Sequence, residues 1–130
     1  MRRVPAATAF ALLLLCAAPA PAAPAAGGFS SDVDTVQIIS ANVGGKNVFI
    51  PSTIVVVAGK PVTLSIFNTT DVPHGFAIPG LGIQEVLPVG EEHAIKLPAL
   101  EGGKVYRVQC QLHAAHRGGT LVVLPAADAK

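Results

Sequence analysis

The residues of this chain that are best suited to chemistry are one cysteine and three histidines: Cys110, His113, His116 and His74. Two of the histidines follow the cysteine by three and six residues, so a short loop would hold all three side chains around a common centre. A thiolate sulfur combined with imidazole nitrogens suits copper, and zinc next. The spacing therefore predicts a metal site, with His74 as a fourth ligand from a neighbouring segment.

Simpler interpretations apply to each residue taken alone, since a single histidine is usually no ligand and a single cysteine is often a small buried hydrophobe. The combination favours a metal site, because the chain has only four histidines and two of them closely follow this cysteine. The fourth histidine, His93, is interpreted as a strand residue without a ligand role. We expect Glu85 to be solvated, and Asp71 to fix the loop before His74 by accepting backbone hydrogen bonds.

The elements that must position these residues are β-strands. Apolar and polar residues alternate with period two in several short runs, and no run of helical length has a period of 3.6. The expected strands are residues 33–39, 47–50, 53–57, 62–67, 93–97, 104–110 and 120–124. Turns rich in glycine and proline separate them, which is typical of an all-β sandwich or barrel. Cys110 then ends a strand and His74 begins one, so a sandwich can bring both to the same end.

The first 25 residues have the layout of a secretory signal peptide. Two arginines precede an apolar stretch over residues 6–18, which is too short to span a bilayer, and alanines with A-x-A spacing follow. We expect cleavage near residue 25, leaving residues 26–130 as one domain exported to the bacterial periplasm. Cys16 does not fit a lipoprotein signal, because leucine stands before it where a small residue is needed.

Charge and cysteine content narrow the class of protein. Residues 26–130 have seven basic and eight acidic side chains, a net charge of −1 with neutral histidine. There is no basic patch, so we expect no nucleic-acid partner, and no apolar run in this part is long enough for a membrane span. Cys110 is its only cysteine, and a lone thiol in an oxidising compartment is expected to be buried or held by a metal.

The order of these residues resembles that of the cupredoxins: one histidine, then Cys-x-x-His-x-x and a further ligand, then glycines and a closing apolar strand. Residues 47–124 are similar to the nitrosocyanins, which are red copper proteins, above all at Gly75-Phe76 and in residues 82–86, 110–113 and 119–123. The segment before and after His74 also resembles the copper domains of cytochrome oxidase subunit II and nitrous oxide reductase. Those domains use two cysteines for a binuclear centre, whereas this chain has one.

The resemblance implies a cupredoxin-like Greek-key β-sandwich that binds one copper ion as Cu(I) or Cu(II). It implies Cys110 and His113 as ligands, with His116 in the place of a second loop histidine, in a loop shorter by two residues. Nitrosocyanins have a glutamate where this chain has His74, and blue copper proteins usually have methionine where it has His116. We therefore expect a site of one cysteine and three histidines, with a lower potential than a methionine-ligated relative.

Electron transfer is the function we expect, because these ligands hold both copper states and a rigid β-scaffold limits their rearrangement. An electron carrier fits better than an enzyme, since the sequence offers no general base with a substrate pocket. Pro79, Leu81 and Leu112 are candidates for apolar shielding of the site. The open alternatives are a periplasmic copper carrier or resistance protein, an open copper site with small-molecule redox activity, and a structural zinc site. The sequence identifies no redox partner and leaves a homo-oligomer open.

Overall fold

Short runs of β-branched and other apolar residues form the strands of this domain, and turns rich in glycine and proline separate the runs. The computed structural model describes residues 34–127, and within them it has nine strands and one short 3-10 helix. The elements are β1 (Thr35–Val43), β2 (Lys46–Ile50), β3 (Thr53–Val57), β4 (Val62–Asn68), β5 (His74–Ile78), η1 (Pro79–Leu81), β6 (Ile83–Leu87), β7 (Glu92–Leu97), β8 (Val105–Val108) and β9 (Gly119–Leu124).

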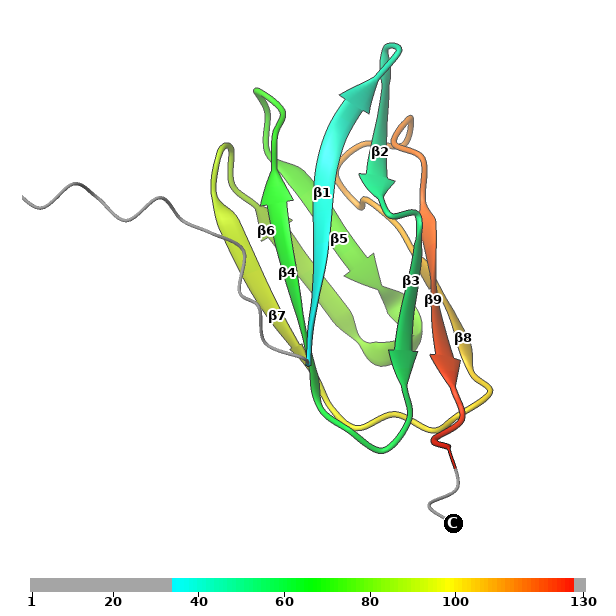
Figure 1. Ribbon diagram of the computed structural model, residues 1–130. Helices are drawn as coiled ribbons and strands as arrows, with labels where there is room; N and C mark the ends of the chain where they lie inside the picture. The colour runs from blue at the N-terminus through cyan, green and yellow to red at the C-terminus, as the bar shows by residue number, and fades with distance from the viewer. Residues whose placement is uncertain (1–33, 128–130) are drawn as a thin grey trace, which may run out of the picture.

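These strands form two layers (Figure 1). The first layer has the order β2-β1-β4-β7, in which β1 and β4 run parallel and the other pairs are antiparallel. The second layer contains the sheet β3-β9-β8, in which β3 and β9 are parallel, and the antiparallel hairpin of β5 and β6. This mixture of non-consecutive neighbours is that of a Greek-key sandwich, as the resemblance to the cupredoxins implies.

A short backbone contact joins the hairpin of β5 and β6 to the rest of the second layer. The amide of Ala77 donates to the carbonyl of Gln109 at 2.8 Å, and the reverse bond measures 2.9 Å. Gln109 directly follows β8, so the continuation of that strand lies beside β5. This contact decides the position of the candidate site, because His74 begins β5 and Cys110 follows Gln109.

Part of the core between the layers comes from strands in which buried and exposed residues alternate. In β3, for example, Ile54 and Val56 are buried while the other three residues are exposed. Phe49 of β2 and Phe76 of β5 meet edge to face from opposite layers, with ring centroids 5.2 Å apart. Burying a side chain of this size stabilises the fold by about 1.5–3 kcal/mol. The two layers are therefore held firmly together beneath the candidate site.

The predicted all-β fold is confirmed, and most predicted strands are found within a residue or two of their expected ends. One prediction was wrong at its end: the strand expected over residues 104–110 stops at Val108, because Gln109 leaves β9 to pair with Ala77. The first strand extends to Val43, since the tight turn that ends it needs the positive φ angles of Gly44 and Gly45. The expected signal peptide and its cleavage position lie outside the described residues.

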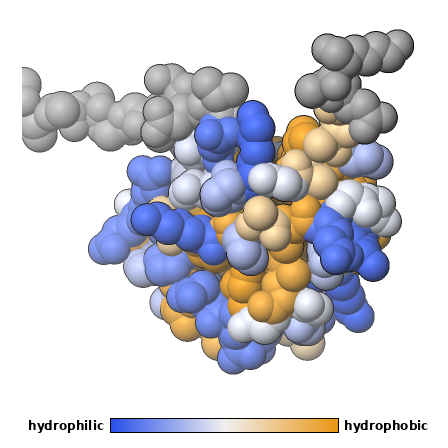
Figure 2. Space-filling model, turned by 90° about the horizontal axis from the view of Figure 1, so that it is seen from below, coloured by the Kyte–Doolittle hydropathy of each residue, from blue (hydrophilic) through white to orange (hydrophobic). Residues whose placement is uncertain are grey.

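The two ends of the sandwich differ in character. The end at the top of Figure 1 carries the tip of the hairpin of β1 and β2, the loop that leads into β5, and the loop between β8 and β9. Figure 2 shows the opposite end, where a band of apolar surface runs between hydrophilic residues. Val57 and Leu124, which end the paired strands β3 and β9, are each 45% exposed. The described residues include no helix long and apolar enough to cross a membrane.

Candidate metal centre

The first side of the candidate site is a strand. All five residues of β5 are buried, and His74, its first residue, has no exposed surface. The loop before it is anchored by Asn68, the last residue of β4. The Asn68 side-chain amide donates to the carbonyls of Val72 and Leu87, at 2.9 and 3.2 Å. Its oxygen accepts bonds from the amide and hydroxyl of Thr70. His74 is therefore held by the buried strand that follows it and by the anchored loop that precedes it.

The second side is the ligand loop, residues 110–118, between β8 and β9. Val108 and Cys110 both point inward, since alternate residues of an extended chain share a face. The loop is closed by the amide of His116, which donates to the carbonyl of His113 at 3.0 Å. Gly118 ends the loop, and a Cβ there would stand 2.6 Å from the carbonyl oxygen of Val108. Only glycine fits there without moving the backbone.

Three of the four residues predicted as ligands converge. The Sγ atom of Cys110 lies 4.0 Å from Nδ1 of His74 and 3.7 Å from Nδ1 of His113. One potential ligand atom from each of the three residues lies within 4.8 Å of the other two. The backbone amide of Gly75 also donates to Sγ of Cys110, at 3.2 Å. A donor of this kind stabilises a thiolate and orients it toward a metal.

The sulfur–nitrogen distances are close to those around one transition-metal ion. Bonds of about 2.3 Å to sulfur and about 2.0–2.1 Å to nitrogen would separate the two ligand atoms by about 3.6–3.8 Å in a trigonal or tetrahedral site. The two sulfur–nitrogen distances lie close to this span. Nε2 of His74 is buried without a hydrogen-bond partner among the described residues, so no strong polar contact holds that ring in another orientation. The donor set therefore fits a metal once side-chain adjustment draws its ligand atoms, which lie within 4.8 Å of one another, closer together.

His116, the fourth predicted ligand, lies beside this group and is not part of it. Its ring is 8% exposed and packs between Phe49 and His74, at centroid distances of 4.3 and 5.0 Å. Its Nδ1 donates to the carbonyl oxygen of Arg117 at 2.9 Å, and its Nε2 lies 3.5 Å from Oγ of Ser40. Nε2 is thus the nitrogen with the lone pair, which faces the Ser40 hydroxyl. Its role as a ligand stays a prediction.

The electrostatics favour neutral imidazoles at this site. Burial lowers the pKa of His74, and His116 and His113 lower it further, while Asp71 opposes them. Burial also lowers the pKa of His116, against the hydrogen bond to the Arg117 carbonyl. A neutral imidazole has a lone pair for a metal, whereas a protonated one has none. Both rings are therefore in the protonation state that a metal needs at neutral pH.

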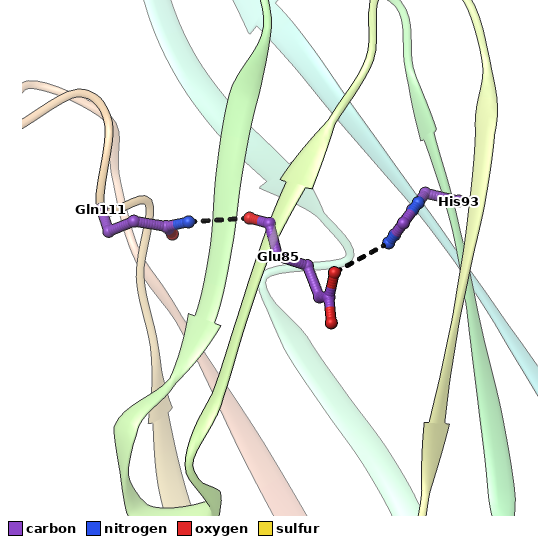
Figure 3. Close-up of polar contacts among 3 residues, drawn as sticks. All are labelled: Glu85, His93 and Gln111. Atoms are coloured by element: carbon purple, nitrogen blue, oxygen red, sulfur yellow. Dashed lines mark hydrogen bonds and ion pairs between the residues drawn. The ribbon is translucent and has the colours of Figure 1, made fainter.

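A polar connection ties the ligand loop to the hairpin of β5 and β6 (Figure 3). The side-chain amide of Gln111 crosses β5 and donates to the backbone carbonyl of Glu85 at 2.7 Å. The crossing is close: a Cβ added at Gly75 would stand 2.2 Å from Oε1 of Gln111. The Glu85 carboxylate in turn lies 3.4 Å from Nε2 of His93. Gln111 is directly bonded to Cys110, so this contact helps to fix the sulfur.

Several smaller predictions are corrected by these contacts. Asp71 makes no hydrogen bond among the described residues, and Asn68 fixes the loop before His74 instead. Pro79 and Leu81 do not shield the site, because they form η1 at the far end of β5. Leu112 does lie in the ligand loop, where it is 48% exposed.

The two remaining charged residues of this region, Glu85 and His93, were expected to be a solvated carboxylate and a strand residue. His93 does lie in β7, and Glu85 is exposed on β6. They form an ion pair with each other at 3.4 Å, which the sequence did not indicate. Neither residue belongs to the group around Cys110.

Sequence reasoning missed Asn68 and Gln111 as residues that build the site. Asn68 stands at the end of an alternating run, and an asparagine before threonines is a common turn signal. Its bond to Leu87 joins residues 19 apart, and the bond from Gln111 to Glu85 joins residues 26 apart. Contacts at such separations leave no local pattern.

Comparisons with known proteins agree with this architecture. A profile of the cupredoxin-like domain family matches residues 6–123. A search of curated proteins finds none with significant similarity. Among solved structures, the fold is similar to the metal-binding domain of CopA, the Cu(I)-exporting P-type ATPase of Streptococcus pneumoniae, solved with Cu(I). That alignment has a TM-score of 0.57 and 19% identity, and it covers 73% of this chain and 91% of the CopA domain. With most of its length matched by the family profile, this chain belongs to the cupredoxin-like domain family.

Proposed function

We propose that this protein binds one copper ion through His74, Cys110 and His113, with His116 as the fourth ligand, and that it transfers electrons. The observation that carries the proposal is the convergence of one thiol and two imidazoles within 4.8 Å at a largely buried position. Soft thiolate with imidazole is a donor set for copper, and rigid placement suits electron transfer. Membership of the cupredoxin-like domain family and the copper-bound CopA domain support copper over zinc.

When bound, the copper ion would supply one-electron chemistry between Cu(I) and Cu(II). The chain's own residues keep the surroundings constant. β5 fixes His74, and the Gly75 amide holds the sulfur of Cys110. Buried aromatic residues exclude water beneath the site, since Phe49 and Phe76 pack together there. His113 is only partly buried, so among the proposed ligands it lies nearest to the surface.

His116 sets the character of the site in this proposal. Its Nε2 is the nitrogen with the lone pair, because Nδ1 donates to the Arg117 carbonyl, and a metal would take the place of the Ser40 hydroxyl beside Nε2. A third imidazole favours Cu(II) more than a thioether does, so we expect a lower potential than that of a methionine-ligated site. The variant His116→Met should raise the potential. An unchanged potential in this variant would remove His116 from the ligand set.

Optical and EPR spectra of the Cu(II)-loaded protein test the proposal, measured beside Cys110→Ser and the control His93→Gln. Intense sulfur-to-copper bands should appear in the wild type, persist in His93→Gln and vanish in Cys110→Ser. Their wavelength would also distinguish a blue site from a red, nitrosocyanin-like one. Absence of such bands, with equal or tighter Zn(II) binding, would contradict electron transfer and favour a structural zinc site.

A copper carrier is the second candidate, because the partial exposure of His113 would also let a partner reach the metal. Exchange kinetics separate the two functions. An electron carrier should keep its copper for hours against a Cu(I) chelator and exchange electrons rapidly. A carrier should release copper readily to the chelator.

The proposed place of action is outside the cytoplasm, on the basis of the signal-like first 25 residues. N-terminal sequencing of the protein from an expressing bacterium, fractionated into periplasm and cytoplasm, tests this. A start near residue 26 in the periplasmic fraction is the expected result. An uncleaved chain in the cytoplasm would contradict it.

A further inference from the structure

A groove of about 620 Å³ lies beside the candidate metal centre, between β2 and the end of the ligand loop. It exists because the loop is fastened to the edge of β2: the amide of Arg117 donates to the carbonyl of Asn47 at 2.8 Å, and Arg117 pairs with Val48. The side chains of Lys46, Val48 and Ile50 share a face of β2, since alternate residues of a strand point the same way. All three line the groove.

The groove carries positive charge that nothing in the described residues neutralises. Lys46 and Arg117 both line it and both are exposed. The ion pairs of the described part of the chain are His93–Glu85 and Lys104–Glu101, so neither cation has a carboxylate partner there. No acidic residue lines the groove. Two cations at one hollow are an anion-binding feature, and arginine can hold a carboxylate through two bonds.

The rest of the lining is largely apolar. Val43 is 54% exposed and Ile50 is 42% exposed, although both are large hydrophobic residues, and Val48 lies on the same strand face as Ile50. Phe49 closes the inner side. Apolar walls with a few polar groups, in a volume of roughly 300–1,000 Å³, are typical of small-molecule sites. An inorganic anion would use the cations and leave these walls in contact with water.

We propose that this groove binds a small aliphatic carboxylate. The carboxylate group pairs with Lys46 and Arg117, and the hydrocarbon chain lies along Val43, Val48 and Ile50. This site is separate from the copper ligands, and its occupancy does not require a metal.

The groove is in contact with the candidate metal centre through two residues. The ring of Phe49 lies 4.3 Å from the ring of His116, and the carbonyl of Arg117 accepts a bond from Nδ1 of His116 at 2.9 Å. A carboxylate that pulls on the Arg117 side chain therefore acts on the residue that orients His116. His116 resonances are thus a reporter of binding in the metal-free protein.

The experiment is an NMR titration of the metal-free protein with octanoate. Saturable shifts are expected in residues 46–50 and 117–118 and in the His116 ring. Lys46→Gln and Arg117→Gln should each weaken octanoate binding several-fold, and the double variant about tenfold or more, because the two charges act together. The control Lys96→Gln removes an exposed lysine elsewhere and should leave the affinity unchanged. Higher ionic strength should weaken binding, because it screens exposed charges.

Two comparison compounds separate charge from apolar contact. Sulfate should bind more weakly than octanoate if the apolar walls contribute, and 1-octanol more weakly if the cations contribute. The proposal is overturned by absence of saturable shifts, by equal affinity in the double variant, or by shifts confined to the opposite apolar end near Val57 and Leu124. The copper proposal is tested separately, since Cys110→Ser should abolish the copper bands and leave octanoate binding intact.

Discussion

The two sides of the candidate metal centre are built in different ways. His74 starts a strand whose five residues are all buried, and that strand pairs with β6 on one side and with Gln109 on the other. The ligand loop is mostly exposed between Gln111 and Gly118, and it is held by isolated hydrogen bonds. The pairing of a whole strand thus fixes one ligand, whereas a few single hydrogen bonds fix the others. Substitutions on the His74 side should change the free energy of unfolding. Substitutions in the ligand loop should change the properties of the metal site.

The largest effect is expected from Asn68→Ala, which removes the anchor of the His74 side. Two carbonyls, those of Val72 and Leu87, would lose their donor, and the bond with Leu87 is buried. Leaving buried polar groups unpaired costs about 1–3 kcal/mol each. We expect the free energy of unfolding, measured by urea denaturation, to fall by about 3 kcal/mol.

Asn42→Ala is the matched control. Asn42 also uses its side chain twice, toward Asn47 and the amide of Gly45, but at an exposed position. Water can replace those bonds, so the loss should stay below about 1 kcal/mol. If Asn68→Ala and Asn42→Ala lose the same free energy of unfolding, burial does not make the hydrogen bonds of Asn68 more important than the exposed ones of Asn42.

A second prediction concerns pH and affects both sides. Burial lowers the pKa of His74 and of His116 below the ordinary value of 6.5, so the unfolded chain binds protons that the folded chain does not. The stability of the metal-free protein is then complete above pH 6.5 and falls as the pH drops below it. The slope is at most about 1.4 kcal/mol per pH unit for each histidine.

Urea denaturation at several pH values between about 7.5 and 5 measures this slope. The control His93→Gln changes a partly exposed histidine outside the site and should still show the fall in stability below pH 6.5. A stability that stays flat over this interval would contradict neutral, buried imidazoles in the folded chain.

The smallest change in stability is expected from Gln111→Ala, which acts on the loop side. It removes the bond to the Glu85 carbonyl, an exposed contact that contributes about 0.5–1.5 kcal/mol at most. The metal site should respond more clearly than the stability does: the copper bands should shift or broaden, and amide exchange in residues 110–113 should speed up. Gln84→Ala, at an exposed position on the same hairpin, is the control. Unchanged spectra in Gln111→Ala would mean that Gln111 does not position Cys110.

The sequence was sufficient for the parts of the molecule that local pattern controls. The β-branched run over residues 53–57 predicted a strand, and the structure has it. The spacing of Cys110 and His113, together with His74, predicted a group that the structure brings together. The sequence did not predict contacts between residues that lie far apart along the chain. The contacts of Asn68 and Gln111 join distant segments, and β6 was missed because three of its five residues are exposed and leave no alternation.

One feature of the sheet order also governs when the site can form. β9 is the last described strand, and it lies in the middle of its sheet, parallel to β3 and antiparallel to β8. Such non-local pairing forms slowly, and it requires residues 119–124 to be available. A chain in which β9 has not yet paired with β3 and β8 cannot close the ligand loop, so its thiol stays open to oxidants until that strand is in place. Metal capture is therefore expected to follow the pairing of β9 rather than to precede it.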